Sequence, residues 1–478
     1  MSTNQYEPVI GLEVHIQLST QSKAFCADPT VYGAPPNTNI SPVSLGHPGV
    51  LPKLNNQVVN FAVRLGLACN SDIREENEFA RKNYFYADLP KGYQITQHHT
   101  PICNGGYIEI GLNDGGTKEI SITRIHMEED SGKSIHDQHP NKTFVDLNRS
   151  GIALMEIVSK PDLSSPDEVN VYIKKLRSIM RYLGTCDGNM QEGSLRADVN
   201  VSVKKKGEEK LGTRCEIKNV NSIKFMQMAI IYEANRQVDL LEDDKIVDQE
   251  TRLFDTKKNV TKSMRSKEDA HDYRYFPDPD LLPLRLEQSL IDNLKKDLPE
   301  LPDEKKERFI KEHNLPAYEA NILVSEKEVS DYYEEVVKNS DKKLATNWIT
   351  GDLFAVLNKK NISISESPVS AKNLSSLINM ISSGKISGRI AKEVFEIMQE
   401  KNQNPKQIVE SKGLIQQSDP KKLEKIILEV LSNNKDKVDQ YKSGKVKLFG
   451  FFVGQVMKVS EGKANPLVVN EILKNKLK

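Results

Sequence analysis

The chain has 478 residues, which at about 150 residues per domain predicts about three domains. Lysine plus arginine and aspartate plus glutamate both total 67, so the formal net charge is zero, which excludes a protein that is basic or acidic along its whole length. No apolar run approaches the roughly 18 residues that a membrane span needs, and the N-terminus lacks the basic and apolar regions of a secretion signal. We therefore expect a cytoplasmic protein that makes no contact with a membrane.

The N-terminal part, residues 1–289, mixes alternating strand patterns with a few helices, which predicts an α+β domain built on antiparallel sheets. Apolar and polar residues alternate over residues 10–18 and 194–203, as in strands with one buried face. A hairpin is expected over residues 107–125, with its turn at residues 113–116.

A helix in this part has clear start and stop signals. Ser165 is a typical N-cap, Pro166 suits the first helical turn, and Glu168 stands where a capping-box glutamate is found. Apolar residues then recur on one face until Gly184, which suits a helix C-terminus.

Helical periodicity dominates the remainder of the chain. Residues 290–405 are predicted to form an all-α helical domain, in which a helix opens near Ser325 with apolar residues at i, i+3, i+4, i+7 and i+8. Helices that begin at Asp419 and Asn465, each followed by proline, predict a small all-α tail domain at residues 406–478.

The five cysteines, at positions 26, 69, 103, 186 and 215, form no CxxC pair of the kind that clips zinc or forms a redox dithiol. Such spacing favours reduced thiols, most of them buried, in a reducing compartment.

Candidate metal ligands appear first on the strand at residues 10–18. Glu13 and His15 are two residues apart and opposite the apolar face, so their side chains project from the same side of the strand. They can converge on one ion, although a Glu-x-His pair is also common on a solvated face.

Further acids stand in two other predicted strands. His126, Glu128, Glu129 and Asp130 end one strand, where they form either an exposed acidic turn or part of a cation site. Glu156 interrupts an apolar run, which a salt bridge or a metal ion would explain equally well. Carboxylates with an imidazole suit Mg²⁺ or Mn²⁺ better than structural zinc, and magnesium suggests phosphate chemistry.

Neither a GxxxxGK[ST] loop nor a strand-coupled GxGxxG occurs, so a nucleotide would need another kind of cradle. Residues 81–86 and 91–93 place cations beside aromatic side chains that can hold phosphates and stack a base. The alternative is a surface loop with half-buried tyrosines.

Segments spread along the chain share the order and content of one known family: GLEVHIQL, PNTN, LGHPGVLPKLN, RKNYFYADLPKGYQI, ITRIHMEEDSGK, DLNRSGIALMEIVS, EGSLRADVNVSV, EIKNVNS, DYRYFPDPDLLPL and GFFVGQVMK. They closely resemble the B subunit of the heterotrimeric aspartyl/glutamyl-tRNA amidotransferase, and the resemblance covers essentially the whole chain. It implies a cradle-shaped N-terminal domain at residues 1–289, a helical domain and a tail domain.

The resemblance also implies an activity. In this family, ATP phosphorylates the side-chain carboxylate of Glu on tRNA(Gln) or of Asp on tRNA(Asn), and ammonia then replaces the phosphate to give the amide. The resemblance implies that Mg²⁺ is bound at the catalytic positions Glu13, His15, Glu128 and Glu156. The sequence leaves open whether one misacylated tRNA or both are substrates.

The partners implied by the resemblance are the amidase A subunit, which supplies ammonia from glutamine, the small C subunit, and the misacylated tRNA. This chain lacks the Gly/Ser-rich signature of an amidase. The expected ATP- or substrate-binding residues are Lys82, Tyr84, Lys91, Glu192, Ser194, Arg196, Asp198, Glu216 and Lys218. Salt bridges between neighbouring strands explain the alternating charges of residues 192–198 and 216–219 equally well.

One departure concerns zinc. Many members carry four cysteines near positions 26 to 44, whereas here only Cys26 remains, with Asp28, Ser41 and Ser44 where the others would lie. We therefore expect no zinc at this place.

The last 38 residues hold eight lysines and two glutamates, a local charge of +6. Such a patch neutralises phosphates or merely improves solubility. The resemblance implies tRNA binding here, for which the candidates are Lys442, Lys445, Lys447, Lys458 and Lys463.

Two other classes of protein remain open at this point. A non-catalytic RNA-binding scaffold would need only the lysine-rich tail, and a free-standing metal-dependent phosphotransferase would work without an amidase.

Overall fold

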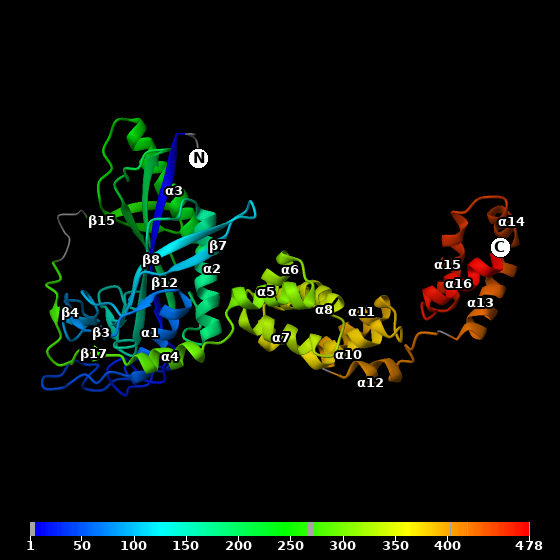
Figure 1. The fold of residues 1–478 in the computed structure, drawn as a ribbon, viewed down its shortest axis with the longest axis horizontal. Helices are drawn as coiled ribbons and strands as arrows, with labels where there is room; N and C mark the ends of the chain where they lie inside the picture. Colours follow the sequence, from blue (N-terminus) through cyan, green and yellow to red (C-terminus); the bar gives the residue numbers. More distant parts are fainter. Residues whose placement is uncertain (1–4, 266–271, 402, 418, 478) are drawn as a thin grey trace. The chain divides into compact units, whose positions relative to one another are not determined.

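The computed structural model describes residues 5–265, 272–401, 403–417 and 419–477 (Figure 1). The chain divides into two compact units, residues 1–304 and residues 305–478. The first unit is rich in strands and the second is helical, which confirms the predicted α+β class.

A ten-stranded sheet forms the frame of the first unit. Its strands follow the order β15-β14-β13-β12-β1-β11-β8-β6-β2, and β7 pairs with β8. The pairs are antiparallel except for β13 with β14. The bounds are β1 (Tyr6–Gln17), β2 (Asp72–Ile73), β6 (Cys103–Asn104), β7 (Tyr107–Gly111), β8 (Thr117–Glu129), β11 (Ala153–Ser159), β12 (Leu195–Lys205), β13 (Cys215–Lys218), β14 (Thr251–Asp255) and β15 (Val260–Arg265).

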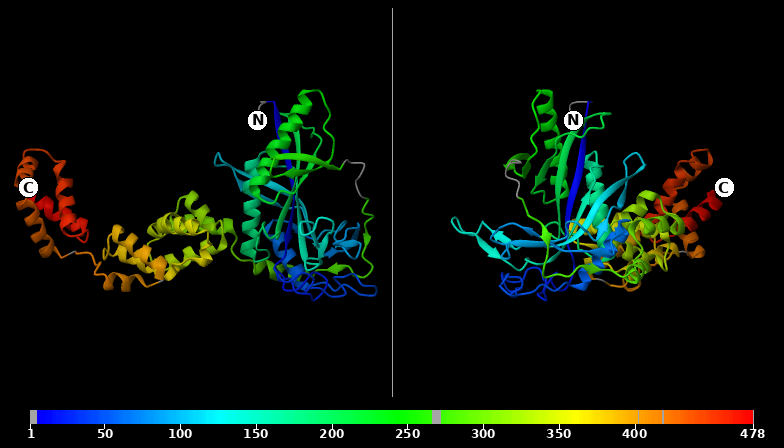
Figure 2. Two further views of the ribbon diagram at one scale, coloured as in Figure 1. Left: turned by 180° about the vertical axis from the view of Figure 1, so that it is seen from behind. Right: turned by 60° about the vertical axis from the view of Figure 1, so that its left-hand side comes forward.

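The central strand β1 separates an apolar face from a polar face, as its alternation predicts. Leu12, Val14 and Ile16 are buried in the hydrophobic core, whereas Glu13 and His15 lie on the opposite face. Three helices cover the apolar face: α1 (Asn56–Ala68), α2 (Pro166–Leu183) and α3 (Ile223–Glu242). Figure 2 shows α2 and α3 along the same side of the sheet.

The predicted hairpin and helix are both confirmed. Strands β7 and β8 form the hairpin, and at its turn the Leu112 N–H donates to the Gly116 carbonyl and the Gly115 N–H donates to the Leu112 carbonyl. Helix α2 begins after Ser165, whose side chain accepts a hydrogen bond from the Glu168 backbone, and Gly184 at its C-terminus has a φ of 68°. The Glu168 carboxylate binds the backbone N–H of Ser164 rather than that of Ser165.

Within the described residues, the first unit has three small sheets besides the large one. The sheet β16-β4-β5 carries the cationic and aromatic segment singled out in the sequence. The other two are the pairs β10-β9 and β17-β3. The bounds are β3 (Glu76–Asn77), β4 (Ala80–Asn83), β5 (Tyr93–Thr96), β9 (Lys133–Ile135), β10 (Phe144–Asp146), β16 (Phe276–Pro277) and β17 (Leu284–Arg285).

The first unit extends past the boundary expected at residue 289. Helix α4 (Gln288–Lys296) packs against α1 and contributes the buried Ile291 to the core of this unit. An amphipathic pattern shows that a helix has a buried face, but it does not show which core receives that face.

The second unit consists of helices around two hydrophobic cores. One core extends from Phe309 to Val409 and the other from Leu423 to Leu477. The helices are α5 (Pro302–His313), α6 (Ala317–Val324), α7 (Lys327–Val337), α8 (Lys342–Asn347), α9 (Phe354–Lys360), α10 (Ala371–Ser382), α11 (Gly388–Lys401), α12 (Pro405–Ser411), α13 (Pro420–Ser432), α14 (Lys435–Lys442), α15 (Leu448–Val459) and α16 (Pro466–Leu477), with a π-helix at Trp348–Leu353 and a 3₁₀ turn at Ile364–Glu366.

All five cysteines are free thiols, four of them buried, as expected. In the part of the chain that the structure describes, no helix has the length and apolar character needed to cross a membrane.

Candidate active site

Carboxylates and imidazoles from three adjacent strands gather on the polar face of the large sheet. Antiparallel pairing aligns His15 of β1 with Glu156 of β11, and Glu156 with His126 of β8. Glu13 lies two residues before His15 on β1, and Glu128 lies two residues after His126 on β8, so both side chains are on the same face. We refer to Glu13, His15, His126, Glu128 and Glu156 as the carboxylate–histidine cluster.

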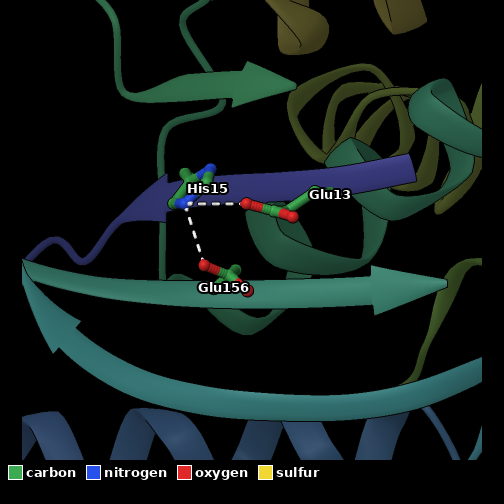
Figure 3. A group of neighbouring side chains, drawn as sticks. All are labelled: Glu13, His15 and Glu156. Carbon is green, nitrogen blue, oxygen red and sulfur yellow. Dashed lines mark hydrogen bonds and ion pairs between the residues drawn. The ribbon is translucent and has the colours of Figure 1, made fainter. Parts of the chain in front are cut away.

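The ring nitrogen of His15 lies at the centre of this cluster. Its Nε2 is 3.1 Å from Glu156 Oε2, 3.4 Å from Glu128 Oε1 and 3.9 Å from Glu13 Oε1. Figure 3 shows the carboxylates of Glu13 and Glu156 turned toward this ring from two strands. The structure therefore brings together the four residues that the sequence singled out as metal ligands.

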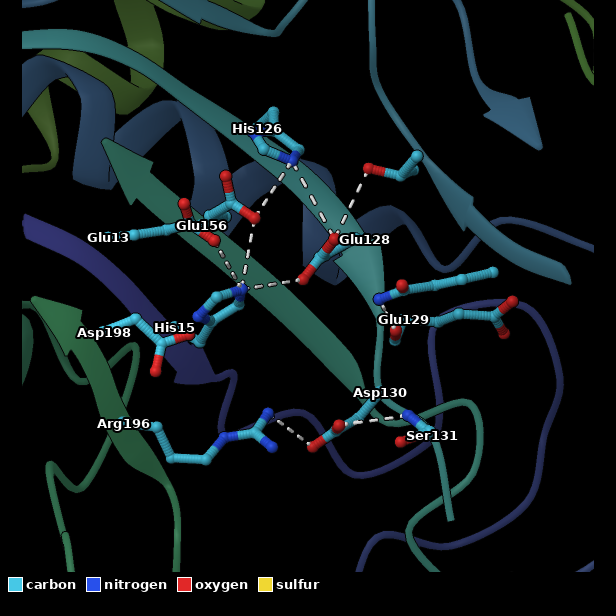
Figure 4. Close-up of polar contacts among 12 residues, drawn as sticks. Glu13, His15, His126, Glu128, Glu129, Asp130, Ser131, Glu156, Arg196 and Asp198 are labelled. Atoms are coloured by element: carbon cyan, nitrogen blue, oxygen red, sulfur yellow. Dashed lines mark hydrogen bonds and ion pairs between the residues drawn. The ribbon is translucent and has the colours of Figure 1, made fainter. Parts of the chain in front are cut away.

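His126 forms the other side of the cluster. Its Nε2 is 3.8 Å from Glu156 Oε2 and 3.9 Å from Glu128 Oε2 (Figure 4). Two overlapping groups of three, Glu13–His15–Glu156 and His126–Glu128–Glu156, each place their ligand atoms within 4.8 Å of one another. Glu156 belongs to both groups.

Burial and proximity shift the pKa values in the cluster. Burial, together with the charge of Glu156, raises the pKa of Glu128 to about 7. Burial disfavours the charged form of His15, but the hydrogen bond with Glu156 and the nearby carboxylates outweigh it and raise its pKa to about 9. Burial lowers the pKa of His126 to about 4. For Glu156, burial is outweighed by the two imidazoles, which hold its pKa below the usual range.

The donor set fits a divalent cation. Three carboxylates this close together repel one another unless a proton or a cation lies between them. Here the His15 imidazolium takes that place, and oxygen ligands with one or two imidazoles are a set that accepts Mg²⁺ or Mn²⁺.

The three consecutive acids at the end of β8 point in different directions. Glu128 faces the cluster, Glu129 accepts hydrogen bonds from Lys91 and the Ile95 backbone, and Asp130 accepts them from Arg196 and Gln17. All three are 3% exposed. The alternative of an exposed acidic turn is therefore wrong.

The polar face continues onto the neighbouring strands β12 and β13. Arg196 Nη2 lies 2.9 Å from Asp130 Oδ2, and Lys218 Nζ lies 2.8 Å from Asp198 Oδ2 and 3.0 Å from Glu216 Oε1. Figure 4 shows Arg196 and Asp198 beside the cluster. The Lys218–Asp198 contact is an ion pair between neighbouring strands, the alternative to substrate binding that the sequence left open, whereas Arg196 binds Asp130, which follows the more distant strand β8.

Lys82 and Tyr84 come from the small sheet and its following loop. Lys82 Nζ lies 4.9 Å from the centre of the Tyr273 ring, and the nearby Glu128 carboxylate helps to raise its pKa against the effect of burial. The Tyr84 hydroxyl donates to Gln94 Oε1 at 3.1 Å. Lys91, by contrast, is engaged by Glu129, which points away from the cluster.

Glu192 and Ser194 lie outside the cluster. They line a neighbouring cavity of about 520 Å³, together with Gln17, Arg149 and Lys133. The sequence grouped Glu192 and Ser194 with Arg196 and Asp198, but only the last two lie on the polar face beside the cluster.

Polar groups surround Cys26, the one cysteine left in the segment compared with zinc-binding relatives. Its Sγ lies 3.6 Å from Ser44 Oγ, and Ser44 also binds the Asp28 carboxylate. The fully buried Lys23 donates to Ser44 Oγ at 3.2 Å and lies 3.8 Å from Asp28 Oδ2.

The tail lysines all lie in the second unit. Lys442, Lys445, Lys447 and Lys458 are exposed, and Lys463 is half-buried and paired with Glu461 at 3.4 Å. They are close in sequence along helices α14 and α15 and the loops that follow them.

His126 lies in the acidic segment at the end of β8 but is not among the four ligands expected from the sequence. The signal was present, because His126 and Glu128 are two apart on a strand, just as Glu13 and His15 are. Arg124 was not expected at the site, and its Nη2 lies 3.7 Å from Glu156 Oε1.

Comparisons with known proteins agree over nearly the whole chain. A model of the GatB/GatE catalytic domain matches residues 8–292, which include the cluster, and a model of the GatB domain matches residues 331–477. The chain is 64% identical to the B subunit of the aspartyl/glutamyl-tRNA(Asn/Gln) amidotransferase of Pelagibacter ubique, over 99% of this chain and 97% of the relative. It is 56% identical to the protein of the same name from Granulibacter bethesdensis, over 100% of this chain and 98% of that relative. The chain therefore belongs to the family of B subunits of the aspartyl/glutamyl-tRNA(Asn/Gln) amidotransferase.

Proposed function

We propose that this chain is the activating subunit of a glutamine-dependent tRNA amidotransferase, a ligase that forms a carbon–nitrogen bond. Its substrates are Glu on tRNA(Gln), Asp on tRNA(Asn), or both. ATP phosphorylates the side-chain carboxylate, and ammonia then displaces the phosphate to give the amide. The names of its relatives and the carboxylate–histidine cluster support this proposal.

The cluster carries the proposal, because the chemistry needs a place where several negative charges meet. A carboxylate oxygen is a poor leaving group, and the phosphate attached to it makes displacement by ammonia feasible. Glu13, His15, Glu128 and Glu156 would hold Mg²⁺, with His126 on the far side of Glu156. The bound ion would neutralise charge on the phosphate oxygens.

Cations beside the cluster suit the same task. Lys82 near Glu128 and Arg124 near Glu156 would bind phosphate oxygens by charge and hydrogen bonds. Arg196 and Lys218, held by Asp130 and Asp198, would orient the aminoacyl end of the tRNA. Tyr84, Lys91, Glu192, Ser194 and Glu216 remain candidates for substrate contact at the borders of this site.

The proposed partners follow from what this chain lacks in sequence. It has no amidase signature, so we propose that an amidase A subunit delivers ammonia and that the heterotrimer is completed by a small C subunit. The tail, residues 406–478, would bind the tRNA backbone through its lysines. Because its substrates are tRNAs in translation, the complex would act in the cytoplasm.

We further propose that the segment around Cys26 needs no zinc. Asp28, Ser44 and the buried Lys23 form a hydrogen-bonded network that holds the loop in place of a metal. The ammonium of Lys23 supplies the positive charge that zinc supplies among thiolates.

The decisive experiment compares wild-type complex with Glu128→Gln in ATP-dependent amidation of misacylated tRNA. We expect the variant to assemble and to bind tRNA as wild type does, but to lose amidation by at least a hundredfold. Glu109→Gln, which changes an exposed glutamate on β7, is the matched control and should remain active.

A second arm tests the division of labour within the heterotrimer. The full chain alone, with ATP, Mg²⁺ and free ammonia, should amidate the misacylated tRNA, whereas with glutamine it should not. Full activity of Glu128→Gln would reject the cluster as the reaction site, and amidation from glutamine by the chain alone would reject the need for an amidase.

A further inference from the structure

Four lysines lie at one edge of the large sheet, several strands away from the carboxylate–histidine cluster. Lys257 and Lys258 belong to the turn between β14 and β15, and Lys262 belongs to β15, the strand at the edge of the sheet (Figure 1). Lys224 belongs to the first turn of α3. All four side chains are exposed. We refer to these four residues as the lysine corner.

The turn between β14 and β15 is held by Asp255. Its Oδ1 accepts hydrogen bonds from the backbone N–H groups of Lys257 and Lys258, both at 3.1 Å, and Asn259 completes the turn with a φ of 55°. Its Oδ2 lies 2.7 Å from Lys262 Nζ. The backbone of the turn is therefore fixed, while the side chains of Lys257 and Lys258 extend into solvent.

The start of α3 lies beside this turn. The ring of Phe225, in the first turn of the helix, is 6.2 Å from the ring of Phe254 at the end of β14. That first turn contains no acidic residue, and it carries Lys224. The N-terminus of a helix has a partial positive charge, so the helix and the lysines raise the potential at the same place.

The lysine corner carries an excess of positive charge. Among the residues that the structure describes, Lys224, Lys257 and Lys258 form no ion pair, whereas Lys262 pairs with Asp255. Four lysines and one aspartate leave a formal charge of +3, on a chain whose net charge is zero. A concentration of unpaired ammonium groups of this kind attracts phosphates.

Lys262 lies on the same face of the sheet as the carboxylate–histidine cluster. The hydroxyl of its neighbour Thr261 donates to Glu233 of α3 at 2.8 Å, so Thr261 faces the helix-covered side. Because successive side chains of a strand alternate between the two faces, Lys262 faces the polar side.

The strand register gives the separation between the corner and the cluster. Lys262 pairs with Leu253, and Leu253 pairs with Lys218. Lys218 binds Asp198, which is paired with Glu13 of the cluster. Four strand spacings of about 4.8 Å make about 19 Å. A stacked nucleic-acid strand has one phosphate per about 3.4 Å of its axis, so this separation corresponds to about six nucleotides.

We propose that the lysine corner binds phosphates of the acceptor strand of the tRNA, about six nucleotides from the aminoacyl end. This inference rests on the proposed function, which brings the aminoacyl end to the cluster. Ammonium groups neutralise phosphates and do not read bases, so the corner positions the strand whatever its base sequence.

The test replaces the two turn lysines together, Lys257→Gln with Lys258→Gln, and titrates the full chain with RNA at several salt concentrations. The probes are a hairpin RNA with the acceptor arm of the tRNA and a hairpin RNA with its anticodon arm. Each lost phosphate contact releases about one counterion fewer, so we expect the slope of log affinity against log salt to fall by about two for the acceptor arm. The slope for the anticodon arm should not change.

Lys205→Gln with Lys206→Gln is the matched control. These two exposed lysines lie at the C-terminal end of β12, where Lys205 pairs with Tyr6. The control removes the same charge from the same unit, and it should leave the slopes for both RNAs unchanged.

Kinetics of the assembled complex distinguish positioning of the tRNA from damage to the catalytic site. With the two turn lysines replaced, we expect the KM for misacylated tRNA to rise about tenfold at moderate salt and kcat to stay at the wild-type value. A fall in kcat with an unchanged KM would contradict a role in binding the strand.

Three binding results would overturn the lysine corner as a phosphate site. They are an unchanged slope for the acceptor arm, an equal decrease for both RNAs, and an equal decrease in the control variant. A failure of the proposed function is separate, since it appears as a wild-type complex that binds the acceptor arm but does not amidate the tRNA.

Discussion

His15 and Glu156 face each other across the β1–β11 pair, with His15 Nε2 3.1 Å from Glu156 Oε2. The contact lies between directly paired residues of two central strands, so the sheet itself sets their separation. A carboxylate and an imidazole held in this way are preorganised to share one cation, and they do not need to lose side-chain freedom when it binds.

Glu156→Gln should remove the ligand common to both halves of the cluster. We expect Mg²⁺ to bind at least tenfold more weakly, because an amide oxygen carries no net charge and His15 loses its anionic partner. Calorimetric titration of the full chain with Mg²⁺ measures this change. Glu109→Gln controls for the loss of one negative charge. An unchanged Mg²⁺ affinity in Glu156→Gln would show that Mg²⁺ does not bind at the cluster.

His126→Asn tests whether the second group of three also holds the ion. Because His126 Nε2 lies within 4 Å of both Glu128 and Glu156, we expect Mg²⁺ affinity to fall about tenfold, as for other groups that ligate or orient ligands. The same titration applies. If affinity stays at the wild-type value while His15→Asn abolishes binding, the ion lies only on the Glu13 side.

Much of this site follows from the sequence because a strand places every second side chain on one face. That rule paired Glu13 with His15, and the apolar run around Glu156 marked its carboxylate as unusual. The rule does not say which strands are neighbours, so the convergence of β1, β11 and β8 needed the resemblance to a known family. The same rule applied to His126 and Glu128 would have found the missing imidazole.

The features that could not be predicted from the sequence depend on contacts between residues far apart in the chain. Tyr275 and His98 stack although 177 positions separate them in the chain, and no local pattern predicts that meeting. Most of helix α4 falls within residues 290–405, the range expected for the helical domain, but its buried Ile291 joins the core of the first unit. Helical character alone does not show which core receives the apolar face of a helix.

Glu233→Gln should reveal a buried ion-pair network between α3, β14 and β15. The Glu233 carboxylate is fully buried and lies 2.6 Å from Arg236 Nη2 and 3.2 Å from Arg252 Nε. Replacing it removes the fully buried carboxylate that the two guanidinium groups share and leaves them only Glu250 among the carboxylates that the structure describes. We therefore expect a loss of about 3 kcal/mol in the free energy of unfolding at pH 7. Urea unfolding measures this loss.

The pH dependence gives that prediction a definite sign. Burial opposes ionisation of Glu233, but Arg236 and the other donors outweigh it and hold its pKa below the usual 4.5. Its contribution is therefore complete above about pH 4.5 and is lost as the pH falls through the lower folded value. The difference in the free energy of unfolding between wild type and Glu233→Gln should therefore become smaller below pH 4.5. Glu335→Gln on the exposed surface should change the free energy of unfolding little at any pH.

Lys23→Met tests the network proposed to replace zinc. The substitution keeps the length of the side chain but removes an ammonium that donates to the Asn39 carbonyl at 2.8 Å and lies 3.8 Å from Asp28. Because Asp28 then remains buried without its cation, we expect a loss of about 3 kcal/mol in urea unfolding. A zinc chelator should leave the wild-type midpoint unchanged, and Lys53→Met on the exposed part of the same loop should be near wild type. A midpoint that falls with chelator would show that a metal holds this loop.

Replacing lysines in the tail should weaken tRNA binding and change its dependence on salt. Lys442 and Lys447 are exposed and flank the turn between α14 and α15, and a lysine that meets a phosphate releases about one counterion. For Lys442→Gln with Lys447→Gln, we expect the slope of log affinity against log salt to fall by about two in tRNA-binding titrations of the full complex. The control, Lys359→Gln with Lys360→Gln at the end of α9, removes the same charge from the same unit and should leave the slope unchanged. An equal decrease of the slope in both double variants would mean that tRNA affinity depends only on net charge. The tail would then have no phosphate-binding surface of its own.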